Sequence, residues 1–343
     1  MEENSSFPRE SGPNEAASAQ QSQPSPKPNF PARIWLMALT ALYAISFFSA
    51  LLIISRKETP RIKAEEESLS SPLSKKDYVG IVPIYGVIYQ DSSSSFVEKG
   101  SQLISTRIKK MAEDKKVKAI VLDINSPGGS VGAVQEIYST IMKARKETKK
   151  PFVARFGEVS ASGGYYIAAA CDKIIAHPGT ITGSIGVIFS VSNIEGLFKK
   201  IGVRSEPIKS GKFKDIGSMT REMSKEEKDL LQAMISDSYE AFLNAVSQGR
   251  NMDREKLKDL ADGRIFTGNQ ALKVGLVDKL GDLQDAIDEA GTMANLGKNP
   301  PVIKNKRYSF DDVLGILDSK LSIFPATSSI PAAPTLEYRW AGF

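Results

Sequence analysis

Apolar and polar positions follow two different periods along the middle of this 343-residue chain. Short apolar runs rich in β-branched residues predict strands, several of them covered on both faces, at residues 78–84, 117–124, 152–156, 173–176 and 184–189. Helical spacing separates these runs, at residues 97–111, 131–145 and 193–200. The alternation predicts one α/β domain with right-handed crossovers over residues 78–298.

A longer amphipathic helix is predicted after this βα region. Ser224 and Glu227 have the spacing of a capping box, in which the serine side chain and the glutamate side chain each satisfy a backbone N–H. The helical pattern continues from there to about residue 249.

The two ends of the chain differ from the middle. Residues 1–33 are rich in Ser, Pro, Gln and Glu and predict a disordered leader. Residues 34–54 carry no charge and are long enough to span a bilayer as one transmembrane helix. Residues 55–77 are expected to form a polar linker, and residues 299–343 an irregular tail.

A cleaved signal peptide is the competing interpretation of the apolar run. The long polar leader and the absence of a small-x-small cleavage site after the run argue against it. A buried soluble helix fits less well, because the run is apolar on every face. The flanking lysines and arginines weakly favour a cytoplasmic location for the C-terminal side.

Composition narrows the possible functions only slightly. The formal net charge is +5, and the lysine-rich stretches lie on or beside a predicted helix, which indicates a solvated face and no nucleic-acid site. The single cysteine, Cys171, excludes an intrachain disulfide and disfavours Cys-ligated metal sites. No cofactor or metal is expected.

Candidate chemistry lies in two glycine-rich turns that each follow a predicted strand. Residues 125–130 (NSPGGS) form the first turn, and residues 161–164 (ASGG) the second. Glycine lets the backbone approach a ligand closely, and the N–H groups at the start of a helix can hold an oxyanion. Ser162 in the second turn is therefore a candidate nucleophile. Neither turn has the Gly-Lys-Ser/Thr ending of a nucleotide-binding loop.

Ser162 needs a base to accept its proton. The only histidine, His177, would require an orienting carboxylate such as Asp172 or Asp215. A lysine with a lowered pKa would not, because burial alone can keep its amine neutral. The segment 209–217 (KSGKFKDIG) offers three lysines, and the residues alone leave both kinds of base open.

An ordered set of motifs resembles the S49 serine peptidases, the family of signal peptide peptidase A, in its short single-repeat form. These motifs are ASGGYYIAAACD at 161–172, TGSIGV at 182–187, SGKFKDIG at 210–217, DGRIFTG at 262–268 and GLVD at 275–278. The resemblance covers about residues 78–290. It implies a crotonase/ClpP-like βα-repeat domain, here preceded by the single transmembrane helix.

The resemblance also implies roles for individual residues. Ser162 is the nucleophile and Lys214 the general base, while Lys212 falls at a non-matching position. Ser184 orients the lysine amine. The backbone N–H groups of Gly163 and Gly129 form the oxyanion hole, and His177 has no catalytic part.

The implied function is that of a membrane-anchored endopeptidase that hydrolyses signal-peptide remnants and other short apolar peptides through an acyl-enzyme. The resemblance further implies a ring-shaped homo-oligomer with active sites shared between adjacent subunits, held in the bacterial cytoplasmic membrane with the catalytic domain outside the cytoplasm. A crotonase-type acyl-CoA enzyme and a non-catalytic membrane scaffold are the alternatives.

The C-terminal tail departs from the family pattern. Its extended, proline-interrupted stretch with Ala326, Ala332 and Ala333 suggests the hypothesis that the tail lies in the substrate groove as a pseudo-substrate.

Overall fold

The computed structural model describes residues 37, 39–47, 49, 76–90, 100–304 and 336–340. The chain divides into two units, Met1–Leu73 and Ser74–Phe343. Residues 39–47 of the first unit are helical, but none of the described helices has the length and hydropathy needed to cross a membrane. The predicted leader lies outside the described residues, as do parts of the predicted span at 34–54 and almost all of the predicted linker.

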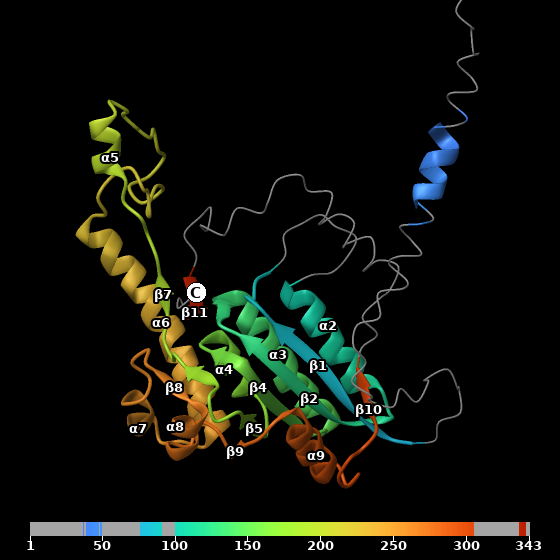
Figure 1. Cartoon of the computed structure of the whole chain (residues 1–343). Coiled ribbons are helices and arrows are strands. Elements are labelled where there is room, and N and C mark those ends of the chain that lie inside the picture. The colour runs from blue at the N-terminus through green and yellow to red at the C-terminus, as the bar shows by residue number, and fades with distance from the viewer. Residues whose placement is uncertain are drawn as a thin grey trace, which may run out of the picture. The chain divides into compact units, whose positions relative to one another are not determined.

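A parallel sheet forms the centre of the second unit (Figure 1). Its strands, in spatial order, are β10 (Val302–Lys304), β1 (Tyr78–Tyr85), β2 (Val117–Ser126), β4 (Phe152–Ala161), β5 (Lys173–Ala176) and β9 (Lys279–Leu280). Every neighbouring pair in this order is parallel. Strand β6 (Ile181–Gly183) runs parallel to the end of β4 and pairs antiparallel with β8 (Ile265–Thr267).

Alternate side chains of the central strands enter two different cores, as the apolar runs predicted. Val79 and Ile81 pack with α9 (Leu283–Met293), whereas Val82 and Ile84 belong to the larger cluster on the opposite side. That larger cluster includes residues of α2 (Gly100–Glu113), α3 (Val131–Thr148) and α4 (Gly163–Ala168). The predicted α/β class with a parallel sheet is confirmed.

A second, smaller sheet lies next to the glycine-rich turns. It joins β3 (Gly128–Ser130), β11 (Leu336–Arg339) and β7 (Ile188–Phe189), with β11 in the middle and antiparallel to both neighbours. The sequence predicted one strand over 184–189, whereas residues 184–187 separate β6 from β7. The chain beyond residue 299, expected to be irregular, contributes β10 and β11, because each has a partner strand that accepts it.

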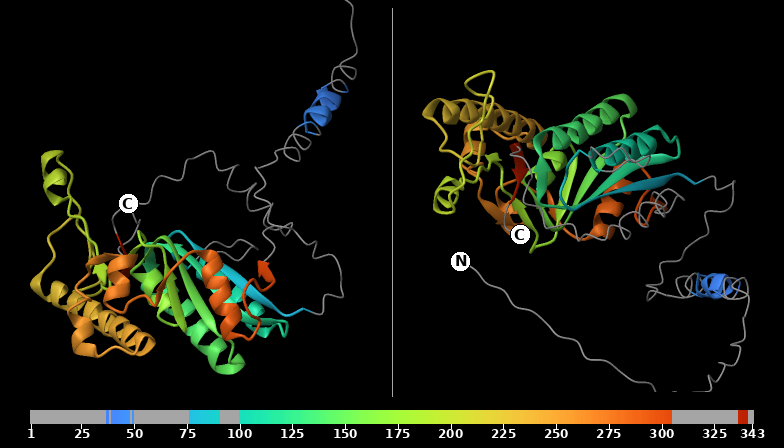
Figure 2. Two further views of the ribbon diagram at one scale, coloured as in Figure 1. Left: turned by 60° about the horizontal axis from the view of Figure 1, so that its bottom comes forward. Right: turned by 90° about the horizontal axis from the view of Figure 1, so that it is seen from above.

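Four more helices follow β7 in the chain, and of these α5 lies apart from the sheet (Figure 1). They are α5 (Glu195–Lys200), α6 (Lys225–Arg250), α7 (Arg254–Lys258) and α8 (Gly268–Lys273). The predicted capping box opens α6: the Ser224 hydroxyl accepts from the Glu227 N–H, and the Glu227 carboxylate accepts from the Ser224 N–H. Residues 190–223, here called the arm, carry α5 and extend away from the sheet in all three views that show it (Figures 1 and 2).

The contact between α6 and the end of α4 generates a stability prediction. A Cβ at Gly249 would lie 1.9 Å from the Ala169 carbonyl oxygen, so Gly249→Ala forces α6 away from the end of α4. We expect a destabilisation of about 1–3 kcal/mol, measured by urea unfolding, despite the higher helix propensity of alanine. Gly196→Ala is the matched control, because nothing lies within 4 Å of its Cβ position. Equal stability of both variants would contradict the prediction.

Candidate active site

Ser162 lies at the tight turn between β4 and α4, in a backbone conformation that L-residues rarely adopt. Its φ is 52° and its ψ is −116°, and the residue is 1% exposed. Strained conformations of this kind persist only where the surroundings impose them, and they cluster at functional sites. One such constraint is the Ser162 N–H, which donates to the Gly183 carbonyl at 2.8 Å. Ser162 is the N-cap residue of α4, but its side chain makes no capping hydrogen bond to that helix.

Ser184 faces the same pocket as Ser162. Its φ is 49°, and its N–H donates to the Arg264 carbonyl at 2.7 Å. A cavity of about 470 Å³ is bounded by the two serines together with Gly186, Val187, Ile188, Ile235, Tyr239, Ala261, Asp262, Gly263, Arg339 and Trp340. The structure therefore brings together two of the predicted site residues. A larger cavity of about 710 Å³, beside the C-terminal half of α3, contains none of them.

The two glycine-rich turns touch through their backbones. A Cβ at Gly128 would lie 2.6 Å from the Gly163 nitrogen, and one at Gly163 would lie 3.1 Å from the Gly128 Cα. Gly128 also has a φ of +100°, which favours glycine. Gly163 therefore lies beside the first turn, in which Gly129 follows Gly128.

Strand β11 lies against these turns. Its Tyr338 is opposite Gly129, and its Trp340 N–H donates to the Pro127 carbonyl at 2.8 Å. On the other side of β3, Ile88 bonds the Gly128 carbonyl and the Ser130 N–H. Because adjacent residues of a strand point their polar groups to opposite sides, the N–H and C=O of Gly129 face Tyr338.

Lys214, the predicted base, lies elsewhere in the described structure. It occupies a turn of the arm, is exposed, and is not among the residues that bound the Ser162 pocket. A single copy of the chain therefore brings together Ser162, Ser184 and the two glycines but leaves the lysine apart.

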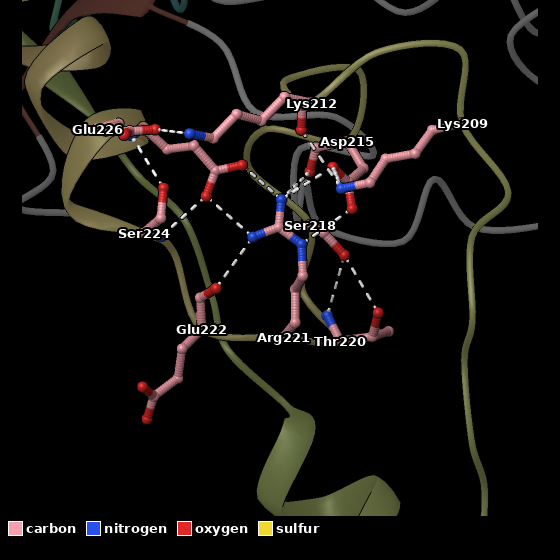
Figure 3. A network of polar contacts seen from close by, with 10 residues as sticks. Lys209, Lys212, Asp215, Ser218, Thr220, Arg221, Glu222, Ser224 and Glu226 are labelled. Atoms are coloured by element: carbon pink, nitrogen blue, oxygen red, sulfur yellow. Dashed lines mark hydrogen bonds and ion pairs between the residues drawn. The ribbon is translucent and has the colours of Figure 1, made fainter.

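An ion-pair network holds the lysine's turn to the start of α6 (Figure 3). Arg221 binds both carboxylate oxygens of Asp215, each at 2.9 Å, and also contacts both oxygens of Glu227. Lys209 pairs with Asp215 at 2.6 Å. Asp215 is the residue that follows Lys214, so the network positions the backbone that carries the lysine.

These contacts change the acidity of both carboxyl groups. The hydrogen bonds from the Arg221 guanidinium, followed by that from the Lys209 amine, hold the pKa of Asp215 well below its usual range. The Arg221 hydrogen bond also lowers the pKa of Glu227 to about 2, helped by the backbone N–H of Ser224. Both groups therefore remain charged throughout the neutral range.

The contacts of His177 are those of a structural residue. Its Nε2 lies 2.8 Å from the Arg155 guanidinium, and its backbone N–H donates to the Thr180 hydroxyl at 3.1 Å. Arg155 in turn pairs with Asp123 at 2.9 Å. In the described residues, the ring thus contacts a cation and has no carboxylate in the place that a triad requires.

The sequence predicted neither strand β11 nor the aromatic contacts around it. The pseudo-substrate hypothesis for the C-terminal tail stays a prediction, because Ala326, Ala332 and Ala333 lie outside the described residues. Tyr166, one turn after Ser162, packs with Phe242 of α6 and with Tyr338. The alternation in LEYRW at 336–340 was a possible signal for a strand, but five residues give no partner. Within the described ranges, no group of three or more His, Cys, Asp or Glu side chains could hold a metal ion.

Comparisons with known proteins agree with the family resemblance that the sequence motifs indicated. The model of peptidase family S49 matches residues 144–297, and that of the NfeD1b N-terminal domain matches residues 88–197. A candidate protease of Synechocystis sp. is 49% identical over 200 residues, which are 58% of this chain and 72% of that protein. A candidate signal peptide peptidase of Enterococcus faecium is 42% identical, over 65% of each chain.

The chain belongs to peptidase family S49. The S49 match contains Ser162, Ser184 and Lys214. Protease 4 of Salmonella typhi is 36% identical over 67% of this chain but only 37% of its own length, so the S49 chain described here is much shorter than that relative. The predictions of a serine peptidase and of its family are confirmed.

The Arg221 network predicts how the thermal stability of the protein depends on pH. Arg221→Ala removes the cation that depresses both carboxyl pKa values, so at pH 7 the variant should unfold at a lower temperature than the wild type. A depressed pKa stabilises the fold above the unfolded-state pKa, near 4, and this contribution is lost as the pH falls towards about 2. The difference between variant and wild type should therefore narrow from pH 5 to pH 3 in thermal unfolding curves.

Lys258→Ala serves as the control for this experiment, because Lys258 belongs to an exposed ion pair with Glu255. We expect little effect from it at any pH. A constant difference between Arg221→Ala and the wild type from pH 7 to pH 3 would contradict the assigned role of the network.

Proposed function

We propose that this S49 chain is a membrane-anchored endopeptidase in which Ser162 attacks peptide carbonyls and Lys214 is its general base. One observation supports the proposal most strongly: Ser162 is held at a left-handed turn, facing a pocket that it shares with Ser184. The glycine turn that contacts Gly163 supplies backbone N–H groups beside the same position.

The proposed reaction is acyl transfer. The neutral Lys214 amine takes the proton of Ser162 while the hydroxyl oxygen bonds to the carbonyl carbon. The N–H groups of Gly163 and Gly129 stabilise the resulting oxyanion, and the lysine ammonium protonates the leaving amine. Water, activated by the same amine, then hydrolyses the acyl-enzyme. Ser184 accepts or donates a hydrogen bond that orients the amine.

The base is proposed to come from an adjacent subunit. Lys214 lies on the arm, whose apolar side chains include Leu197, Ile201, Val203, Ile208, Phe213 and Met219, all exposed in a single copy. Ile208 is completely exposed, and α5 contains no buried residue. Extended apolar surfaces of this kind mark interaction sites. A ring of identical subunits would cover the arm and exclude water from around the Lys214 amine.

The proposed substrates are short apolar peptides, including signal-peptide remnants. The pocket beside Ser162 is bounded by Val187, Ile188 and Ile235, which suit apolar side chains. An extended peptide could pair with strand edges of β3 and β7, since β11 already does so. A relative named as a signal peptide peptidase supports this substrate class.

Residues 34–54 are proposed to anchor the enzyme in the bacterial cytoplasmic membrane, with residues 78–298 outside the cytoplasm. The uncharged run has the length that a bilayer core requires. An anchor would hold the active site near peptides that remain in the bilayer.

Mixing two inactive variants tests the shared active site. Ser162→Ala and Lys214→Ala should each abolish peptide hydrolysis, because one removes the nucleophile and the other the base. Co-assembled in equal amounts, they should recover about a quarter of wild-type activity, since random neighbours pair an intact serine with an intact lysine at that frequency. Hydrolysis is measured with a fluorogenic peptide.

Lys212→Ala is the control, because Lys212 is exposed and pairs with Glu226. It should retain most of the activity. If the mixture recovers nothing although the two variants form mixed oligomers, each active site takes both groups from one subunit. An active Ser162→Ala enzyme would reject the proposed nucleophile.

Deletion of residues 34–54 tests the anchor. The deleted protein should move from the membrane pellet to the supernatant after cell lysis, because the uncharged run is gone. Deletion of residues 2–22, an equally long part of the polar leader, is the control and should leave the protein in the pellet. Retention of both deletion variants in the pellet would contradict the proposed anchor.

A further inference from the structure

The N-terminal ends of the central strands lie at the opposite edge of the sheet from Ser162. Helices α2 and α3 lie side by side and both end at that edge (Figure 1). The Lys150 amine, two residues after α3, donates to three backbone carbonyls at the end of α2, among them that of Asp114 at 2.7 Å. Strand β1 begins at the same place, because the Tyr78 N–H donates to the Lys116 carbonyl at 2.9 Å.

Positive charge is concentrated at this edge. We define residues 109–118 and 143–150 as the basic edge. These two segments contain ten basic and three acidic residues, whereas the whole chain has a formal net charge of only +5. The rest of the chain is therefore net negative. Most of the ten basic side chains are exposed to solvent.

The cavity of about 710 Å³ opens at the basic edge. Half of the ten residues that bound it are basic: Lys143, Arg145, Lys146, Lys149 and Lys150. Asp172, the one carboxylate among the bounding residues, is already paired with Arg145. The other three lysines, 143, 146 and 149, form no ion pair with any described residue. The cavity therefore contains cations without a counter-charge.

Apolar surface adjoins these cations. Met142 and Met293, which also bound the cavity, are 39% and 36% exposed. Lysine amines attract phosphate oxygens, and the flexible thioether side chain of methionine adapts to apolar ligands. Lys143 and Lys146 are three residues apart on one helix, where like charges repel each other, so a bound anion would stabilise them. A phospholipid offers the phosphate and the hydrocarbon in one molecule.

We propose that this cavity binds the phosphate headgroup of an anionic phospholipid, and that the basic edge faces the surface of the bilayer. Residues 55–77, which follow the proposed anchor, lead into β1 at this same edge. Clustered lysines and arginines beside a membrane-spanning segment are attracted to anionic lipids. The inference rests in part on the proposed anchor, and it adds the orientation of the catalytic domain.

This orientation determines how far the active site lies from the lipid. Strand β4 begins after Pro151, at the basic edge, and Ser162 follows its last residue. The ten residues of this strand span about 33 Å. The active site would open away from the headgroups, at a distance that about ten residues of extended peptide can bridge. Substrates would then be peptides that extend out of the bilayer.

The first test measures how lipid protects individual lysines. The full-length chain is placed in bilayer discs of phosphatidylcholine, with or without one part in three of phosphatidylglycerol, and acetylated briefly before mass spectrometry. Lys143, Lys146 and Lys149 should react at least about threefold more slowly in the anionic discs. Lys256 and Lys273, exposed on α7 and α8, should react equally in both and serve as controls. Equal rates for all five lysines would mean solvated helix ends and overturn the proposal.

The second test asks whether the ligand is a lipid or a free phosphate. Inorganic phosphate and pyrophosphate are added to the full-length chain in phosphatidylcholine discs, at an ionic strength matched with sodium chloride. We expect neither to slow acetylation of the three lysines more than chloride does. Protection by either anion as strong as that in the anionic discs would overturn the lipid assignment.

The third test removes the charges. Lys143, Lys146 and Lys149 are all replaced by Gln in the full-length chain, and phosphatidylglycerol binding in neutral detergent is titrated by native mass spectrometry. The apparent Kd should rise at least about tenfold. A matched triple variant with Gln at Lys225, Lys256 and Lys273 should keep the wild-type Kd. An equal Kd for all three proteins would contradict a lipid site in the cavity.

These measurements do not use hydrolysis, so they succeed or fail independently of the proposed chemistry at Ser162. If the full-length chain does not enter the discs, the proposed anchor fails, and the chain is mixed with preformed vesicles. Sedimentation with phosphatidylglycerol vesicles and not with phosphatidylcholine vesicles would still support the cavity. No sedimentation with either would overturn it.

Discussion

The close contact between two glycine turns is the constraint on which the rest of the site depends. Gly128 and Gly163 approach so closely that a Cβ on Gly128 would overlap the Gly163 nitrogen, at 2.6 Å, and a Cβ on Gly163 would lie only 3.1 Å from the Gly128 Cα. This contact aligns the start of α4, and with it Ser162, against the strand that carries Gly129. The left-handed conformation of Ser162 is then maintained by its hydrogen bond to Gly183, which belongs to the turn that presents Ser184. The strain at Ser162 is offset by the packing of three segments, which carry Gly128, Gly163 and Gly183.

The proposed nucleophile and the proposed base lie in parts of the S49 domain that differ in solvent exposure. Ser162 lies in the buried body, where helices cover the sheet on both faces, whereas Lys214 lies on an exposed arm tied down by Arg221. With Lys214 as the proposed base, the amine would become a competent proton acceptor only when another surface covers the arm. Peptide hydrolysis would then require the assembled oligomer.

The small sheet of β3, β11 and β7 joins the C-terminal strand to the glycine turn that carries Gly129. Strand β11 contributes backbone pairing, and Tyr338 contributes an aromatic side chain in a closed pocket. Burial also raises the pKa of Tyr338, so its phenol remains a hydrogen-bond donor to the Ser238 carbonyl. Backbone pairing and burial of a side chain stabilise this terminal strand, and the same two kinds of contact bind extended peptides to strand edges.

Local patterns in the sequence were sufficient for the parallel sheet, the capping box at Ser224 and the candidate nucleophile, because periodicity, caps and glycine turns act over a few residues. The split of residues 184–189 and the strands β10 and β11 could not be predicted, since short strands form only where a partner edge is available. The tertiary structure alone decided which distant residues lie around Ser162: Ser184 in the same pocket and the glycine turn with Gly128 beside it, but not Lys214. Those contacts join positions far apart in the chain, and only the packing of the whole domain sets such distances.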